Sequence, residues 1–416
     1  MSLVIRGGRL YDPAQGIDKV GDLHLENGKI AEKGTAEEEI QAKGLLVVPG
    51  LIDMHVHFRE PGREDKETIA SGCEAAVAGG FATVACMANT GHPTDTAAHV
   101  TYVRKRAEEI GLANVHPIGA VSKGLRGEEL AELGTMARAG AVAFSDDGQP
   151  VLNSELMRRA LEYARMFDRV VISHCEDATL TRGAVMNEGE VSAELGLRGW
   201  PNVAESAMAA RDILLAELTG ARVHLAHVSA RQTVELVRWA KRRKIPVTAE
   251  VTPHHLALAD DRLREYDSRF KMNPPLRTAE DVSAVLAGLA DGTIDAIASD
   301  HAPHTVEEKE QELAACPNGV VGLETTVGVV LDLVAAGKLP LARAIEALTW
   351  APAGILGLRR GTLLPGVSAD VTLLDLKAAW KVDPKSFRSR GRSSPFSGMK
   401  LRGRAVHTIV GGRLCY

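Results

Sequence analysis

The feature that most constrains the fold of this 416-residue chain is an alternation of short apolar runs with amphipathic segments across its middle. Apolar runs of strand length, separated by segments with helical spacing, are typical of βα units in a parallel sheet. Two of the intervening segments, 154–165 and 230–241, predict helices, the second with Ser229 as its N-cap. Strands are predicted at 46–57, 82–87, 115–118, 141–144, 170–174, 223–228, 247–251 and 294–299. Eight such repeats predict an α/β fold of the (β/α)8 TIM barrel type.

The two ends of the chain have a different pattern. Residues 1–45 and 361–416 contain short apolar runs broken by glycine-rich turn signals, which favour strands and hairpins. Neither end carries enough apolar surface for a stable sheet alone, so we expect both to pack together. The predicted organisation is a small β-domain from 1–50 and 358–416 beside a barrel from 51–357. The basic segment 385–400 is predicted to be a surface loop.

Composition excludes several classes of protein. Hydrophobic residues make up 45% and charged residues 25% of the chain, which are ordinary values for a globular protein. A net charge of -5 offers no basic field for nucleic acid. The apolar run 44–52 is too short to cross a membrane, so we expect a cytoplasmic protein. The five cysteines are scattered without CxxC spacing, which argues against a disulfide framework or a thiolate metal cluster.

The strongest local signal is the pair His55 and His57, which follows the first apolar run of the predicted barrel. Residues two apart in a strand point to the same face, so both imidazoles can face one point. Active sites of barrels lie at the carboxyl ends of the strands, and imidazole nitrogen is a good ligand for zinc. An isolated pair of this kind fits ordinary hydrogen-bonded rim histidines equally well.

Further candidate ligands follow other predicted strands. Taken singly, each of them is better explained as a helix cap or a hydrogen-bonded buried group. A closed barrel brings all the strand ends to one mouth, however, where the set can hold one or two metal ions. The predicted ligands are His55, His57, Asp147, His174, His227 and Asp300.

Several motifs along nearly the whole chain resemble the amidohydrolase superfamily, and within it the dihydroorotases of the bacterial class I type. They are Asp53-Met-His-Val-His-Phe-Arg-Glu-Pro-Gly, Met87-Ala-Asn-Thr, Phe144-Ser-Asp-Asp-Gly, Asn273-Pro-Pro-Leu-Arg, Ser299-Asp-His-Ala-Pro-His and the tail that begins at Gly361. Superfamily members that act on hydantoins or allantoin usually have a carbamylated lysine after the fourth strand, where this chain has Ser145-Asp146-Asp147. The resemblance indicates Asp147 as the ligand and leaves Asp146 as a supporting or turn residue.

The resemblance implies a zinc-dependent dihydroorotase that interconverts N-carbamoyl-L-aspartate and (S)-dihydroorotate in pyrimidine biosynthesis, with one or two Zn²⁺ per subunit. In such an enzyme a metal-bound hydroxide attacks the ring amide carbonyl, and Asp300 acts as general base and then general acid.

The substrate's own carboxylate needs recognition by groups other than the metal ligands. Arg59 offers a planar fork suited to a carboxylate, and Asn89 and His304 can add donors. The resemblance further implies substrate contacts by His57, Asn273, Asn318 and Gly319. His254 and His255 are not predicted as ligands, because adjacent residues of an extended chain cannot both face one site. The segment 305–320 is a candidate for a loop that closes over the site.

Two other functions stay open. One is a different cyclic amidohydrolase, of the hydantoinase or allantoinase type, for which a carboxylate pocket has no use. The other is a silent homologue that serves as a scaffold for a transcarbamoylase. Relatives occur as homodimers and as complexes with aspartate transcarbamoylase, and neither state is decided by this sequence.

Overall fold

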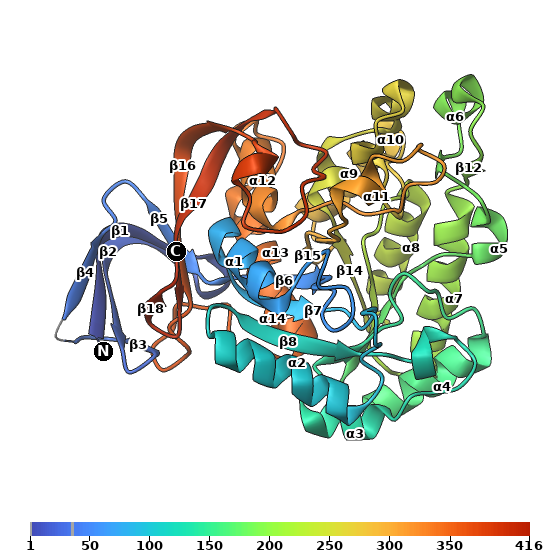
Figure 1. Cartoon of the computed structure of the whole chain (residues 1–416). Coiled ribbons are helices and arrows are strands. Elements are labelled where there is room, and N and C mark those ends of the chain that lie inside the picture. Colours follow the sequence, from blue (N-terminus) through green and yellow to red (C-terminus); the bar gives the residue numbers. More distant parts are fainter. Residues whose placement is uncertain (1, 35–36) are drawn as a thin grey trace.

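The structure is a computed structural model that describes residues 2–34 and 37–416. Its described part forms a barrel of parallel strands surrounded by helices, with a second sheet from both chain ends at its side (Figure 1). The predicted fold, a (β/α)8 barrel with a terminal β-sheet, is confirmed. Residues 1, 35 and 36, which fall in the predicted terminal domain, lie outside the described residues.

Within the described residues, eight strands follow one another round the barrel in chain order. Each strand pairs in parallel with the next, and a bridge between Val56 and His301 links the two edges. The strands are β6 (Leu51–Val56), β7 (Phe81–Cys86), β8 (Asn114–Gly119), β9 (Ala143–Phe144), β10 (Val170–Ser173), β13 (Val223–Leu225), β14 (Val247–Val251) and β15 (Ala296–Ile297). Their carboxyl ends therefore meet at one mouth.

Helices cover the outside of the barrel (Figure 1). The longer ones are α1 (Ile69–Gly79), α2 (Ala97–Ile110), α3 (Leu133–Ala139), α4 (Ser154–Arg165), α7 (Val203–Thr219), α8 (Arg231–Arg242), α10 (Ala279–Ala290), α12 (Leu323–Ala335), α13 (Leu341–Leu348) and α14 (Trp350–Leu356). Shorter elements in the connections are α5 (Ala178–Thr181), β11 (Met186–Asn187), α6 (Glu190–Leu195), β12 (Gly199–Trp200), α9 (Pro253–Ala257) and α11 (Val306–Lys309). No helix of the described residues has the length and apolar character needed to span a bilayer.

The two predicted helices differ in how well their starts were placed. Helix α4 has the predicted bounds, and the side chain of Asn153 caps its first turn by accepting from the amides of Glu155 and Leu156. The predicted cap of α8 is wrong. Its N-cap is Ala230, and the hydroxyl of Ser229 instead donates to the buried carboxylate of Glu205. The hydroxyl that the capping rule predicts at the start of α8 instead serves a contact with a residue distant in the sequence.

The second sheet combines strands from both ends of the chain, in the order β18-β17-β16-β5-β1-β2-β3, with β4 on β1. Its strands are β1 (Ser2–Asp12), β2 (Ile17–Glu26), β3 (Lys29–Ala31), β4 (Glu38–Gln41), β5 (Leu46–Pro49), β16 (Val371–Lys381), β17 (Lys400–Val410) and β18 (Arg413–Leu414). Leu3, Ile5, Val371 and Leu373 are among its buried side chains. Each large apolar side chain buried fully stabilises the fold by about 1.5–3 kcal/mol.

The predicted strand 46–57 is wrong as a single element. Its first part is β5, which pairs with β16 in the terminal sheet, and its second part is β6, which opens the barrel. The break is at Gly50, where a Cβ atom would lie 2.7 Å from the Cβ atoms of both Ala82 and Asp370. The residues on both sides of this glycine are apolar because β5 and β6 are both buried in their sheets. The hydrophobic pattern of the sequence therefore does not indicate that the chain changes sheet here.

The segment 385–400 is largely irregular, and its basic side chains Lys385, Arg388 and Arg390 are exposed, as expected for a surface loop, but other side chains of the segment pack inward. Ser389, Ser394 and Phe396 are buried. The hydroxyl of Ser389 donates to Glu67 at 2.5 Å, and the carboxylate of Glu67 lies 3.1 Å from the ring of His301. This connection between β16 and β17 therefore packs onto the mouth of the barrel.

Candidate metal centre and active site

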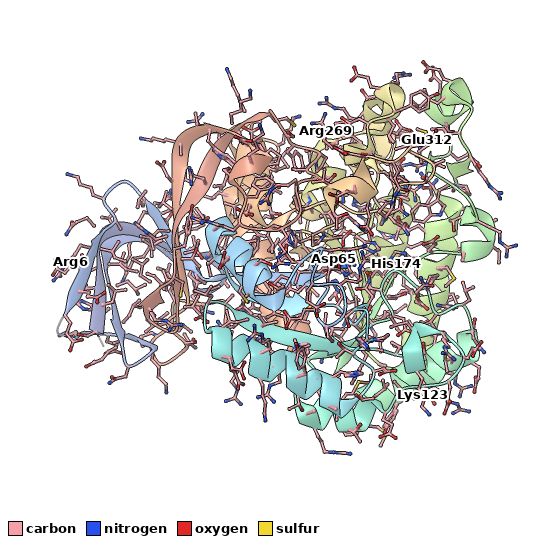
Figure 2. All side chains as sticks on the ribbon, in the orientation of Figure 1. Arg6, Asp65, Lys123, His174, Arg269 and Glu312 are labelled. Atoms are coloured by element: carbon pink, nitrogen blue, oxygen red, sulfur yellow. The ribbon has the colours of Figure 1, made fainter. Side chains whose placement is uncertain are left out.

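Six predicted ligands lie at the carboxyl ends of five barrel strands. His55 is in β6 and His57 follows it, while Asp147, His174, His227 and Asp300 follow β9, β10, β13 and β15. All six are at least nine-tenths buried. In Figure 2, His174 is labelled within the barrel, far from Arg6 of the terminal sheet. The structure thus brings these side chains, which span 55 to 300 in the sequence, to one mouth.

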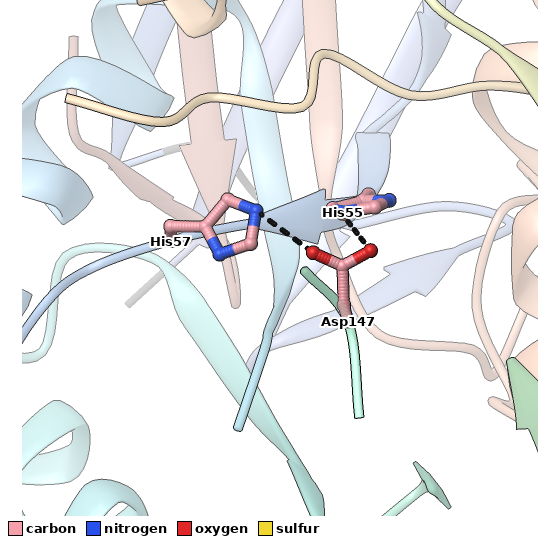
Figure 3. Close-up of side chains that lie close together, drawn as sticks. All are labelled: His55, His57 and Asp147. Carbon is pink, nitrogen blue, oxygen red and sulfur yellow. Dashed lines mark ion pairs between the residues drawn. The ribbon is translucent and has the colours of Figure 1, made fainter. Parts of the chain in front are cut away.

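The six residues contain two groups whose ligand atoms all lie within 4.8 Å of one another. One group is His55, His57 and Asp147, drawn in Figure 3, and the other is Asp147, His174 and His227. Asp147 belongs to both groups. Its Oδ1 atom is 3.4 Å from His55 Nε2 and 3.3 Å from His227 Nε2, and its Oδ2 atom is 3.5 Å from His57 Nε2. A carboxylate in this position can join two cations.

Polar partners outside the cluster orient three of its histidines. His55 Nδ1 lies 2.6 Å from Glu250 Oε1, and His57 Nδ1 lies 2.7 Å from Asn89 Oδ1. Both acceptors can be satisfied by a proton on Nδ1, which leaves Nε2 of each ring able to offer its lone pair to a cation at the centre. Such outer partners are the usual support of metal-ligating histidines.

His174 shows the same arrangement with the opposite ring atoms. Its Nε2 atom is 2.9 Å from Glu176 Oε2, which leaves the lone pair of Nδ1 facing His227 Nε2 at 2.9 Å. Two ring nitrogens this close need a proton or a cation between them. In addition, His55 Nε2 is buried without a hydrogen-bond partner. Both observations fit a site built for metal ions.

Electrostatics favour positive charge at this place. Burial opposes the charged form of His55, yet the carboxylates of Asp147 and Glu250 outweigh it and raise the pKa of His55 well above its ordinary value. In the same way, His55, His174 and His227 outweigh burial and hold the pKa of Asp147 well below its usual range. A divalent cation would satisfy the same carboxylates that here favour protonated imidazole.

The two neighbouring aspartates after β9 have separate partners. Asp146 Oδ1 accepts from the amide of Val121 at 2.7 Å, and its other oxygen accepts from the hydroxyl of Ser122. Asp146 therefore holds the loop after β8, whereas Asp147 faces the histidines. The geometry agrees with Asp147 as the candidate ligand.

Asp300 lies on the His55 and His57 side of the cluster. Its Oδ1 atom is 3.0 Å from His57 Nε2 and 3.5 Å from His55 Nε2. Its backbone φ is 47°, in the left-handed region, as is that of His227 at 35°. A non-glycine residue in this region carries a cost of the order of 1–3 kcal/mol, and such costs gather at functional sites.

The predicted carboxylate-binding residues Arg59 and His304 lie together beside this cluster. Arg59 donates from Nε to the carbonyl of Pro303 at 3.2 Å, and its Nη2 atom is 3.5 Å from His304 Nε2. The neighbouring carboxylates have other partners: Glu60 accepts from Tyr102, and Glu64 accepts from the amide of Gly62. The side chains of this arginine and this histidine therefore form one candidate subsite.

The other predicted substrate residues occupy several places round the mouth. Asn89 donates to the carbonyl of Asp147 at 3.1 Å in addition to its contact with His57, so its amide supports the cluster itself. Asn273 donates to Glu176 at 2.9 Å, and its Oδ1 atom is buried without a partner. Asn318 is exposed, but its carbonyl accepts from His304 Nε2 at 2.8 Å. Gly319 lies against Ala302, where a Cβ atom would be 2.9 Å from the carbonyl oxygen.

The segment after β14 corrects one sequence argument. His254 and His255 lie in the short helix α9 and not in an extended chain, and both are buried. His255 contacts the carbonyl of Pro274 at 3.1 Å, while His254 Nε2 has no hydrogen-bond partner. Neither belongs to the two candidate metal groups.

Sequence reasoning missed two carboxylates with a part in this site, Glu250 and Glu176. A sequence signal for Glu250 is its place as the one charged residue of β14, where the structure buries it fully. Glu176 stands two residues after His174, where it could have been expected to lie near the same ring.

Comparisons with known proteins agree with this geometry. Residues 44–233 match the family model described as dihydro-orotase-like. The chain is 54% identical to the dihydroorotase of Pelotomaculum thermopropionicum, over all of this chain and 98% of that protein. It is 51% identical to the dihydroorotase of Geobacter metallireducens, over the full length of both.

Among solved structures, an L-hydantoinase (dihydropyrimidinase) from Arthrobacter aurescens is similar, with a TM-score of 0.89 and 28% identity. The match covers 99% of this chain and 95% of that structure. A D-hydantoinase from Thermus sp. shares the fold, with a TM-score of 0.80. The fold is thus shared with hydantoinases. Because about half of its residues are identical to those of two dihydroorotases over the whole length, the chain belongs to the dihydroorotase family.

Proposed function

We propose that this chain is a zinc-dependent dihydroorotase that interconverts N-carbamoyl-L-aspartate and (S)-dihydroorotate. The observation that carries the proposal is a candidate metal centre with a shared carboxylate, Asp147, beside a subsite formed by the guanidinium of Arg59 and the ring of His304. The first feature suits hydrolysis of an amide and the second suits a substrate that has a carboxylate of its own. Both features are needed for dihydroorotate.

We assign the metal to His55, His57, Asp147, His174, His227 and Asp300. Imidazole nitrogen and carboxylate oxygen, without thiolate, are ligands that suit Zn²⁺ in catalytic sites. A zinc ion bound there would lower the pKa of water and polarise a carbonyl group. The two overlapping groups at Asp147 support room for two ions.

We assign proton transfer to Asp300. Its carboxylate is buried, and the neighbouring histidines keep its pKa below the ordinary range, so it is ionised at neutral pH. During ring opening it accepts a proton from the attacking water and delivers it to the departing ring nitrogen. Ring closure uses the same carboxylate in the reverse order.

We assign recognition of the substrate carboxylate to Arg59 and His304. A guanidinium can form two parallel hydrogen bonds with a carboxylate, and the ring N–H of His304, which here donates to the carbonyl of Asn318, can be shared with the carboxylate as a third. The backbone at Asn318 and Gly319 lies against His304, and Asn273, with its free Oδ1 atom, is assigned a separate substrate contact beside Glu176. A hydantoin or allantoin ring has no carboxylate to use these donors.

The test is a comparison of substrates with the zinc-loaded protein. Hydrolysis of dihydroorotate, of 5,6-dihydrouracil, which is the same ring without the carboxylate, and of hydantoin is followed by ultraviolet absorbance. We expect turnover of dihydroorotate, a much lower kcat/KM for the other two, and loss of both reaction directions in Asp300→Ala. Turnover of hydantoin without turnover of dihydroorotate would establish the hydantoinase alternative, and inactivity of the zinc-loaded protein on all three would leave the scaffold alternative.

A further inference from the structure

Lys66 is a lysine in an uncommon position. It lies in the loop between β6 and α1 and is only 8% exposed, although lysine is rarely buried without a specific partner. Its Nζ atom lies 3.1 Å from His304 Nδ1 and 2.9 Å from Glu308 Oε2. Glu308 in turn pairs with Arg63 at 2.9 Å. The buried ammonium group therefore stands directly behind the histidine of the carboxylate subsite.

The contacts of His304 determine where its ring proton is. The carbonyl of Asn318 can only accept, so the 2.8 Å contact requires the proton on Nε2. An ammonium group can only donate, so the contact with Lys66 requires a lone pair on Nδ1. Both contacts are satisfied by one state, the neutral ring with its proton on Nε2. Glu308 also lies 3.0 Å from Nδ1, but in this state it takes its hydrogen bond from Lys66.

A neutral His304 also agrees with its surroundings. Burial, together with the positive charges of Arg59 and Lys66, lowers the pKa of His304 to about 3. The ring therefore remains a neutral donor across the physiological range.

The direction of this N–H has a consequence for binding. His304 Nε2 and Arg59 Nη2 are 3.5 Å apart, and in this state both are donors. Two donors at this distance do not bond to each other. A carboxylate placed beside them would accept from Arg59 and share, as a three-centre hydrogen bond, the Nε2–H that here donates to the carbonyl of Asn318. Lys66 adds a second positive charge, beside that of Arg59, close behind His304. The arrangement favours an anionic group over a neutral one.

We infer that Lys66 is a positioning and specificity residue, which holds His304 as the Nε2–H tautomer and tunes the subsite for a carboxylate-bearing ring. The inference rests on the proposed function and extends it to a residue outside the candidate catalytic and metal-binding set. Lys66 acts through His304 and does not itself need to touch the substrate.

The first experiment measures specificity. The ratio of kcat/KM for dihydroorotate to that for 5,6-dihydrouracil is determined for the zinc-loaded wild type, Lys66→Met, Lys66→Arg and the control Lys123→Met, whose lysine is an exposed ion-pair partner of Glu129. We expect Lys66→Met to reduce the ratio by about tenfold through KM for dihydroorotate, because a buried charge and donor are lost. Lys66→Arg should recover most of the ratio, and Lys123→Met should leave it unchanged.

The second experiment observes the tautomer without any turnover. Ring nitrogen-15 NMR of the zinc-loaded protein, with the His304 signals assigned by their loss in His304→Asn, distinguishes a protonated nitrogen from one with a lone pair. We expect a single Nε2–H form in the wild type and a mixture of tautomers in Lys66→Met. An unchanged specificity ratio with an unchanged Nε2–H spectrum in Lys66→Met would overturn the inference. Failure of the wild type to hydrolyse dihydroorotate would instead overturn the proposed function, and the NMR result would still decide the role of Lys66.

Discussion

Glu250 Oε1 lies 2.6 Å from His55 Nδ1, and both side chains are fully buried. The carboxylate comes from inside β14 and the imidazole from the end of β6, which are not adjacent strands of the barrel. Burial disfavours the ionised carboxylate, but His55 and His224 outweigh it and lower the pKa of Glu250 to about 2. An anion is thus held directly behind a candidate metal ligand.

The first prediction concerns this pair. Glu250→Gln keeps the shape of the side chain but removes the anion that orients His55, and we expect metal affinity to fall by about 10–100-fold. Competition with a chelator, followed by metal analysis, measures the change. Glu310→Gln, on an exposed side chain, is the control. Equal zinc affinity of Glu250→Gln and the wild type would show that Glu250 does not support the ligand.

The second prediction separates Asp146 from Asp147. Asp147→Asn should lose zinc and dihydroorotate turnover while the fold stays intact, because the shared ligand loses its charge. Asp146→Ala should retain zinc but lose about 1–3 kcal/mol of folding free energy for each buried amide left without an acceptor. Metal analysis and denaturant unfolding distinguish the two. Loss of zinc in Asp146→Ala, with zinc retained in Asp147→Asn, would show that Asp146 is the ligand and Asp147 the supporting residue.

The third prediction concerns Arg59. Arg59→Lys keeps the charge but loses the two-pronged geometry, so KM for dihydroorotate should rise about tenfold or more while zinc content is unchanged. Steady-state kinetics and metal analysis of the same preparation provide the measurement. A fall in zinc content that matches the loss of activity would argue that Arg59 supports the metal centre and not the substrate.

The fourth prediction is a pH dependence of stability. Burial first, and then Arg59 and Lys66, lower the pKa of His304 to about 3 from an ordinary value of 6.5. The unfolded chain therefore binds a proton below pH 6.5 that the folded chain does not bind until about pH 3, and stability is lost as pH falls through this window. For this one group the loss is about 2 kcal/mol between pH 6 and 4.5.

Denaturant unfolding of the metal-free wild type and of His304→Asn, at several pH values, isolates the contribution of this histidine. The difference in unfolding free energy between the two proteins should shrink towards acid, because only the wild type has to exclude the proton. Parallel pH profiles of the two proteins would contradict a neutral buried His304.

The sequence predicts the barrel and the candidate ligands for a physical reason. Parallel strands of a closed barrel end at one mouth, so polar residues after apolar runs, such as His174 and His227, necessarily come together. The pattern cannot reveal a change of sheet at Gly50, because strands of both sheets are buried there. It also cannot reveal long-range contacts such as Ser389 with Glu67, which are 322 residues apart.

Support of the ligands is the part of the site least accessible to sequence reasoning. The contact of Glu250 with His55 depends on how β6 and β14, which β15 separates, lie in the closed barrel. The contact of Lys66 with His304 depends on the path of two loops. Neither path follows from periodicity, because loops are shaped by their tertiary partners. The predicted N-cap at Ser229 failed for the same reason, since Glu205 takes its hydroxyl.

The most direct measurement is a zinc titration of the metal-free protein, with bound zinc and dihydroorotate hydrolysis measured on the same samples. Convergence of the histidines on Asp147 predicts that the rate of ring opening rises with bound zinc, returns to baseline on chelation, and never rises in Asp147→Asn. A full rate of hydrolysis in the metal-free protein, or in Asp147→Asn, would contradict a catalytic centre built round this aspartate.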